Sequence, residues 1–121
     1  MSSDFLEILR QKNSMRQAEW PADFPVDMLF RGLELAGETG ELAGAVKKLY
    51  RSMNGIGGNG HDQSKYIDNI KEEMGDVLIC LDLLALKLES DLNIPFDLEQ
   101  VTRDKFDATS RKVNLTTMFG D

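Results

Sequence analysis

The sequence predicts an all-α fold, a helical bundle of about four helices with a central antiparallel helix pair. Apolar residues recur every three or four positions along two long segments, residues 26–53 and 64–92, which is the period of one face of an α-helix. A glycine-rich stretch at residues 54–63 separates them and favours a flexible loop. No segment shows convincing strand-like alternation. We therefore expect one all-helical domain over residues 1–121.

The composition excludes several classes of protein. The formal net charge of the 121 residues is −7, and such a negative field repels nucleic-acid backbones and anionic membranes. No apolar run approaches the roughly 18 residues of a membrane span, and the first residues lack the basic start and apolar core of a signal peptide. We expect a cytoplasmic protein with no nucleic-acid or membrane partner. Cys80 is the single cysteine, so the chain has no internal disulfide and no cysteine-type zinc site.

The first helix is expected over residues 4–17, with Ser2 or Ser3 as its N-cap. Its apolar face consists of Phe5, Leu6 and Leu9. Two prolines then interrupt the chain, so residues 20–25 should form a turn-rich connector.

The second helix should run from about residue 26 to residue 53. One narrow sector of this helix holds its apolar residues Leu35, Leu42, Val46 and Leu49. The adjoining sector carries Glu34, Glu38 and Glu41. Glycines at positions 37, 40 and 44 weaken the helix by up to about 1 kcal/mol each relative to alanine. We expect the close approach of another helix or a ligand to compensate.

The third helix should run from about residue 64 to residue 92 as the central element. Its apolar residues keep the spacing of a bundle seam for three heptads: Ile67, Ile70, Met74, Val77, Leu81, Leu84 and Leu88. After Asp76 the segment is apolar almost all round, which is typical of a buried helix. Asp97 should cap a fourth helix that ends near residue 113, and the tail after it has no clear period.

Two pairs of carboxylates stand beside the apolar stripes. Glu38 and Glu41 are three residues apart on the second helix, as are Glu73 and Asp76 on the third, so each pair projects from one helix face. Like charges at this spacing repel one another, and partial burial raises the cost. A helical hairpin would bring the pairs face to face, where a hard divalent cation such as Mg²⁺ would offset the repulsion.

Two other interpretations stay open at this point. Pairs of acids three residues apart are common on solvated helix faces, where they bind nothing. A di-iron carboxylate bundle is the competing metal site, but it uses Glu-x-x-His on two of its helices. His61 is the only histidine and belongs to the predicted loop, so the di-iron interpretation is poorly supported.

The segment LAGETGELAGAVKKL, followed by KEEMGDVLICLDLLA, resembles the paired motif of the MazG-like all-α nucleoside triphosphate pyrophosphohydrolases. That family carries E-x-x-E on one helix and E-x-x-D on the next. The resemblance covers residues 28–92 and extends more loosely over the fourth helix. It implies that the metal ligands are Glu38, Glu41, Glu73 and Asp76.

The resemblance also implies a reaction. An enzyme of this kind depends on Mg²⁺, with Mn²⁺ as a substitute, and cleaves an NTP or dNTP between the α and β phosphates by metal-activated water. The products are a nucleoside monophosphate and pyrophosphate, and either Glu38 or Glu41 would orient or deprotonate the water. A homodimer or homotetramer is implied as well. The alternative is a non-catalytic nucleotide-binding or protein-interaction module derived from the family, against which the complete set of acids argues.

Residues outside the acidic pairs are candidates for binding the substrate. Lys105, Arg111 and Lys112 on the last helix are candidates for the phosphates, the alternative being a solvated helix face with favourable C-terminal charge. Trp20 is a candidate to stack on the base, against the alternative of core packing or of anchoring the hinge before the second helix. Cys80 lies in the most apolar stretch, where a thiol stays protonated and unreactive, so no covalent intermediate is expected.

Overall fold

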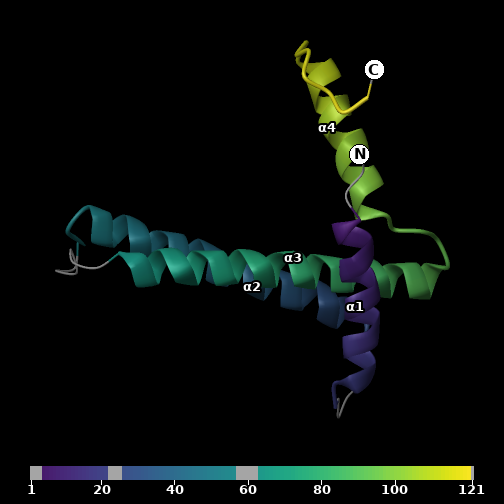
Figure 1. The fold of residues 1–121 in the computed structure, drawn as a ribbon, viewed down its shortest axis with the longest axis horizontal. Helices are drawn as coiled ribbons and strands as arrows, with labels where there is room; N and C mark the ends of the chain where they lie inside the picture. Colours follow the sequence, from purple (N-terminus) through teal and green to yellow (C-terminus); the bar gives the residue numbers. More distant parts are fainter. Residues whose placement is uncertain (1–3, 22–25, 57–62, 121) are drawn as a thin grey trace.

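The structure is a computed structural model that describes residues 4–21, 26–56 and 63–120. Within these ranges it consists of four α-helices and no strand (Figure 1). The helices are α1 (Phe5–Glu19), α2 (Met28–Met53), α3 (Ser64–Leu92) and α4 (Leu98–Lys112). The predicted all-α fold is confirmed.

Some of the predicted features lie outside the described residues. These are the caps Ser2 and Ser3, most of the connector before α2, and residues 57–62 of the predicted loop, which include His61. Helix α1 ends at Glu19, two residues later than predicted. No helix in the described ranges combines the length and the hydropathy needed to cross a membrane.

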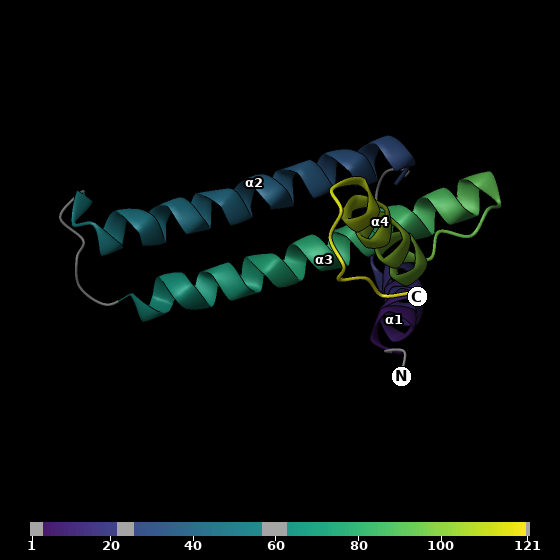
Figure 2. The ribbon, with the colours of Figure 1, turned by 90° about the horizontal axis from the view of Figure 1, so that it is seen from above.

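The centre of the fold is an antiparallel hairpin of α2 and α3, which lie side by side along most of their length (Figures 1 and 2). Helix α1 crosses the hairpin at the end opposite the connecting loop and makes its main packing contacts with α3. Helix α4 points away from the hairpin, and its described residues make no contact of similar extent with the other helices. The hairpin is therefore the frame on which everything else is placed.

Aspartates begin the second and fourth helices. The Asp27 carboxylate accepts a hydrogen bond from the Phe30 backbone N–H at 2.8 Å, and Asp97 accepts one from the Gln100 N–H at 3.1 Å. The predicted cap at Asp97 is confirmed. The predicted start of α2 at residue 26 is too early, because Asp27 keeps extended backbone as the N-cap.

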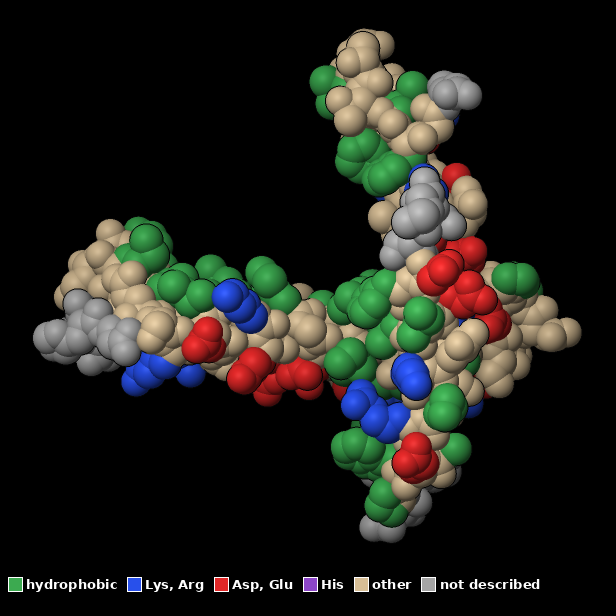
Figure 3. All heavy atoms as spheres, viewed as in Figure 1, with side chains coloured by type: hydrophobic (Ala, Val, Ile, Leu, Met, Phe, Trp, Pro, Cys, Tyr) green, Lys and Arg blue, Asp and Glu red, His purple; other side chains and the backbone are tan. Residues whose placement is uncertain are grey.

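The core of the single chain is small. Its buried apolar side chains among the described residues are Ala45, Cys80 and Ala85. Large apolar side chains are instead spread over the surfaces of the hairpin and of α4 (Figure 3). The prediction that α3 is buried beyond Asp76 is wrong for the chain alone, because Leu78 and Leu81 remain 36% and 37% exposed.

The glycines of α2 do not mark a contact with another helix of this chain. A Cβ atom placed on Gly37, Gly40 or Gly44 would meet nothing within 4 Å. The expected close approach of a second helix is therefore wrong within the described part of the chain. The physical reason is that α2 packs on α3 through a different sector, which contains Leu35, Leu42 and Leu49.

The C-terminal tail folds back on α4 and forms one unit with it. The Asp107 carboxylate accepts hydrogen bonds from the backbone N–H groups of Phe119 at 2.7 Å and Gly120 at 3.0 Å. The Ser110 hydroxyl donates to the Thr117 carbonyl at 2.7 Å. These bonds join side chains of α4 to irregular backbone, so the sequence of the tail shows no periodic pattern from which they could be predicted.

Replacing Asp107 with asparagine should release the tail from α4. The hydrogen bonds from Phe119 and Gly120 lower the pKa of Asp107, against the opposing effect of burial. Because the folded-state pKa lies below the ordinary value, this stabilisation is present at neutral pH and is lost as the pH falls through the folded-state pKa. We expect amide hydrogen exchange at Phe119 and Gly120 to accelerate by roughly tenfold or more in Asp107→Asn. Exposed Asp104 provides the control Asp104→Asn, and unchanged exchange in Asp107→Asn would contradict the prediction.

Candidate metal centre and adjoining cavity

Three carboxylates meet between α2 and α3. One oxygen atom each from Glu38, Glu73 and Asp76 lies within 4.8 Å of the others. One face of α2 carries buried and half-buried positions along its length: Leu35, Glu38, Leu42, Ala45, Leu49 and Ser52. Those along the facing side of α3 are Tyr66, Ile70, Glu73, Val77, Cys80 and Leu84. Glu38 and Glu73 thus belong to the two helix faces that pack together, and the antiparallel pairing brings them into one group.

Two oxygen atoms of this group are buried without a protein partner. They are Oε2 of Glu38 and Oε2 of Glu73, for which no hydrogen bond is found among the described residues. A buried polar atom without a partner destabilises the fold, and a charged one does so more strongly. Such atoms, grouped with the exposed carboxylate of Asp76, point to a positively charged ligand.

The pKa values of these acids show that negative charge is in excess here. Burial raises the pKa of Glu38, followed by a hydrogen bond with Glu41 and by the charges of Glu41, Asp76 and Glu73. Burial also raises the pKa of Glu73, followed by the charges of Glu41 and Asp76, while Lys48 acts in the opposite direction. Glu41 is exposed and lies outside the group of three, yet it acts electrostatically on both of its half-buried members.

The donor atoms fit a hard divalent cation. Carboxylate oxygens suit Mg²⁺, Ca²⁺ or Mn²⁺, whereas imidazole and thiolate favour softer metals. Cys80 is close to the acids, and its thiol is protonated at neutral pH, because burial, and then the charges of Glu34, Glu38 and Asp76, raise its pKa to about 11. The predicted protonated state of Cys80 is confirmed, although carboxylates contribute to it as well as apolar surroundings.

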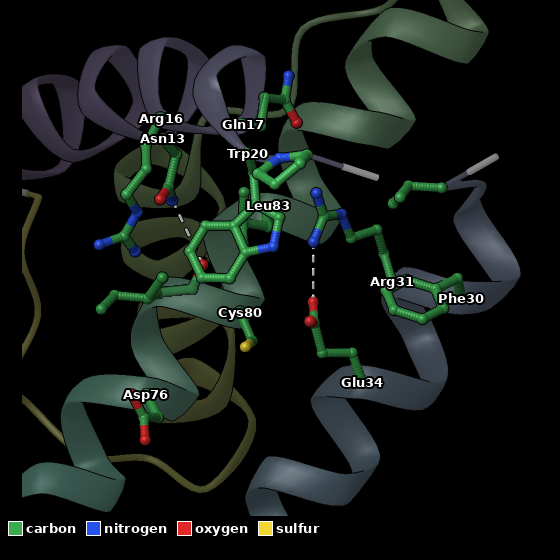
Figure 4. A pocket seen from close by; sticks show the side chains of 13 residues that line it. Asn13, Arg16, Gln17, Trp20, Phe30, Arg31, Glu34, Asp76, Cys80 and Leu83 are labelled. Atoms are coloured by element: carbon green, nitrogen blue, oxygen red, sulfur yellow. Dashed lines mark hydrogen bonds and ion pairs between the residues drawn. The ribbon is translucent and has the colours of Figure 1, made fainter. Parts of the chain in front are cut away.

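A cavity of about 360 Å³ opens beside the acidic group. Asp76 belongs to both, so the cavity and the carboxylates form one continuous site. Its walls come from all three helices of the crossing region, and the apolar lining consists of Trp20, Pro21, Val26, Phe30, Ile79 and Leu83. In Figure 4 the Trp20 side chain extends into the cavity rather than into the protein core. Core packing of Trp20 is excluded, because 68% of the residue is exposed.

Polar groups stand at defined places in the cavity. On α2, the Arg31 Nη1 atom donates to Glu34 Oε1 at 3.0 Å, an ion pair visible in Figure 4. On α1, Asn13, Arg16 and Gln17 line the opposite wall. The cavity therefore combines an apolar slot with groups that donate and accept hydrogen bonds, which is the usual composition of a small-molecule site.

A comparison with protein families shows to which family the chain belongs. A family model for the MazG nucleotide pyrophosphohydrolase domain matches residues 31–113, well over half of the 121 residues. The chain belongs to the MazG family. The match spans almost all of α2 and the whole of α3 and α4, and it confirms the resemblance inferred from the paired acidic motifs. No curated protein and no solved structure matches the chain significantly.

The matched MazG region also contains the three basic candidates, but the structure does not bring them to the acids. Lys105, Arg111 and Lys112 lie on α4, which points away from the hairpin (Figure 1). None of them contributes to the pKa values of Glu38 or Glu73. Within one copy of the chain these cations stand apart from the acidic group.

Several residues that line the cavity were not predicted as site residues from the sequence of this MazG domain. Glu34 lies one helical turn before Glu38 on the acidic sector of α2, so its place was foreseeable in part. Arg31 is three residues earlier and pairs with it. Asn13 is 63 positions before Asp76, and only the crossing of α1 over α3 brings the two into one cavity.

In this MazG domain, Glu73→Gln should stabilise the protein when divalent ions are chelated. The pKa of Glu73 is raised in the folded state, so ionisation of this group lowers the free energy of unfolding. That free energy is therefore highest at low pH, where Glu73 is protonated, and it falls as the pH rises through the folded-state pKa. We expect the melting temperature of Glu73→Gln in EDTA to exceed that of the wild type by roughly 2–4 °C near neutral pH, and to match it below about pH 4. Asp68→Asn, exposed on the same helix, is the control. A variant less stable than the wild type at neutral pH would refute the excess of negative charge.

Proposed function

We propose that this chain is a Mg²⁺-dependent nucleoside triphosphate pyrophosphohydrolase. It would cleave an NTP or dNTP between the α and β phosphates to a nucleoside monophosphate and pyrophosphate. The observation that carries the proposal is the group of Glu38, Glu73 and Asp76, with its two unpartnered buried oxygens, in a member of the MazG family. Members of that family are typically metal-dependent. A cytoplasmic location is part of the same proposal.

The acids would divide the work between holding metal and handling water. When bound, Mg²⁺, or Mn²⁺ in its place, supplies Lewis-acid polarisation of the phosphate oxygens and lowers the pKa of water. Glu38, Glu73 and Asp76 are suited to hold it, because their oxygens already form one group. Glu41 is exposed, lies outside that group and acts on the pKa of Glu38 through its charge. It is therefore better placed than Glu38 to orient the attacking water and accept its proton.

The cavity would receive the base and the sugar. Since Asp76 borders both the cavity and the acidic group, a nucleotide lying in the cavity would direct its phosphates toward the acids. Trp20 stands in the cavity with most of its surface exposed, and an indole offers a face on which a base can stack. This gives Trp20 the role of a substrate-binding residue.

A second copy of the chain would complete the assembly. A compact monomer of 13.6 kDa exposes about 6,600 Å², whereas this chain exposes 9013 Å². The difference exceeds what a standard protein interface buries on each partner. Helix α4, whose described residues pack mainly on the C-terminal tail, would carry Lys105, Arg111 and Lys112 to the phosphates at the site of the other copy, in a homodimer or a homotetramer.

The chemistry can be tested by measuring pyrophosphate release across common and damaged nucleoside triphosphates with Mg²⁺ and Mn²⁺. Asp76→Ala should lower kcat by at least about 100-fold while the protein stays folded, because a metal ligand is lost. Asp68→Ala, on the solvated face of the same helix, should retain the wild-type rate. In ¹⁸O-labelled water under single turnover, the label should appear in the monophosphate. Label in pyrophosphate, or orthophosphate as the first product, would exclude attack at the α phosphate.

The contribution of α4 from the second copy predicts complementation between two inactive proteins. The Asp76→Ala variant keeps the basic side chains of α4. A triple alanine variant of Lys105, Arg111 and Lys112 keeps the acidic group. After unfolding and refolding together, an equal mixture should recover about one quarter of the wild-type rate, because half of the random dimers are mixed and each has one intact site. Light scattering should give a mass of at least two chains. A monomer, or a mixture without recovered activity, would contradict the arrangement.

A further inference from the structure

The most deeply buried polar side chain of α3 stands where α1 crosses it. Asp82 is 1% exposed and uses both carboxylate oxygens to bind α1. Its Oδ1 accepts from Arg10 Nε at 2.8 Å, and its Oδ2 accepts from Asn13 Nδ2 at 3.0 Å. Asp82 follows Asp76 by six residues, so it lies about 9 Å farther along α3. It lies outside the acidic group and does not line the cavity that Asp76 borders.

Arg10 extends the same network to the end of α3. Its Nη2 atom donates to the Phe96 carbonyl at 2.8 Å and its Nη1 atom to Glu89 Oε2 at 3.4 Å. Glu89 in turn accepts a hydrogen bond from the Phe96 backbone N–H at 2.9 Å. One guanidinium therefore joins α1, α3 and the chain that leads to α4.

Apolar packing fixes α1 only in part. Leu6 and Leu9 are half-buried, whereas Phe5, Ile8 and Met15 are 56%, 47% and 60% exposed, and the one buried residue of α1 is the polar Asn13. A hydrogen-bonded ion pair is directional in a way that apolar contact is not, and a buried one is costly to desolvate. The orientation of α1 thus depends on the polar network more than on a hydrophobic interface.

The orientation of α1 matters because α1 supplies one wall of the cavity. Asn13 and Gln17 are four residues apart on one face of α1, Trp20 is the C-cap of that helix, and all three line the cavity. Asn13 belongs to both features: it lines the cavity and donates to Asp82. A rotation of α1 about this point would move the indole of Trp20 relative to Asp76.

We propose that Asp82, acting through Arg10 and Asn13, is a positioning residue for nucleotide binding. It holds α1 so that Gln17 and Trp20 face the base and sugar. The identity of the ligand rests on the proposed function, whereas the placement of Trp20 does not. The acids that hold metal belong to α2 and α3 and not to α1, so loss of Asp82 should weaken binding and leave the chemical step intact.

The test compares wild type with Asp82→Asn, which keeps the size of the side chain and removes its charge. KM for the best nucleoside triphosphate should rise roughly tenfold, and kcat should stay within about twofold. Trp20 is the only tryptophan, so its fluorescence reports on the cavity directly. Binding of the matching α,β-methylene analogue should weaken to the same extent, and quenching of Trp20 by acrylamide should change even without nucleotide.

Two further variants separate positioning from stability. Leu49→Ala removes apolar packing at the loop end of the α2–α3 hairpin, away from the cavity, and it should lower the melting temperature with KM and Trp20 quenching unchanged. The exchange of Asn13→Asp with Asp82→Asn leaves one carboxylate beside Arg10, and it should restore part of the lost affinity. If Asp82→Asn alone does not fold, this exchange and Arg10→Lys carry the same comparison.

The proposal is overturned if the Asp82 variants lose only thermal stability, with KM and Trp20 quenching as in the wild type. A fall in kcat at constant KM would also overturn it, because it would place the effect on the acids. If the wild type hydrolyses no nucleoside triphosphate, the proposed function fails separately. Acrylamide quenching then still decides whether Asp82 places Trp20.

Discussion

The antiparallel packing of α2 on α3 is the constraint on which the rest of the structure depends. It joins two apolar stripes, and the same contact brings together carboxylates that repel one another. Glu38 and Glu73 lie in the packing faces themselves, half-buried, each with a buried oxygen that has no partner among the described residues. Burial and mutual charge raise the pKa of both. The repulsion between these carboxylates therefore destabilises the hairpin locally, and a bound divalent cation would offset that repulsion.

The site separates chemistry from recognition by helix. Every acid of the proposed reaction belongs to α2 or α3, whose relative position is fixed by a long packing contact. In the proposed function, recognition would fall largely to α1, which crosses α3 and lines the cavity with Asn13, Gln17 and Trp20. Because α1 is held mainly by the polar network around Asp82, small changes in that network would alter which nucleotide fits without disturbing the acids. A MazG domain of this design could change specificity at little risk to catalysis.

The openness of the single chain follows from the same geometry. In a two-helix hairpin each helix packs on its partner with one face and leaves the opposite face exposed. Helix α1 covers only one end of the hairpin. Apolar residues such as Leu33, at 64% exposed, and Met74, at 54%, are left at the surface. Helix α4 and the tail are joined by the hydrogen bonds of Asp107 and Ser110, and the described residues of α4 make no extensive contact with the other helices. A second copy would cover these surfaces and also supply cations to an acidic site.

The sequence by itself determined the features that depend on local periodicity and local capping. The bounds of α3, the cap at Asp97, the all-α class and the facing acids of α2 and α3 can be read from spacings of three and four. Only the tertiary structure decided what depends on contacts between distant segments. In the sequence, Asp82 is a charged residue in an apolar helix with no evident partner. The structure shows that its partner is Arg10, 72 residues away. The exposure of α3, the cavity between three helices and the direction of α4 follow likewise from how helices cross, and no single helix carries that information in its own period.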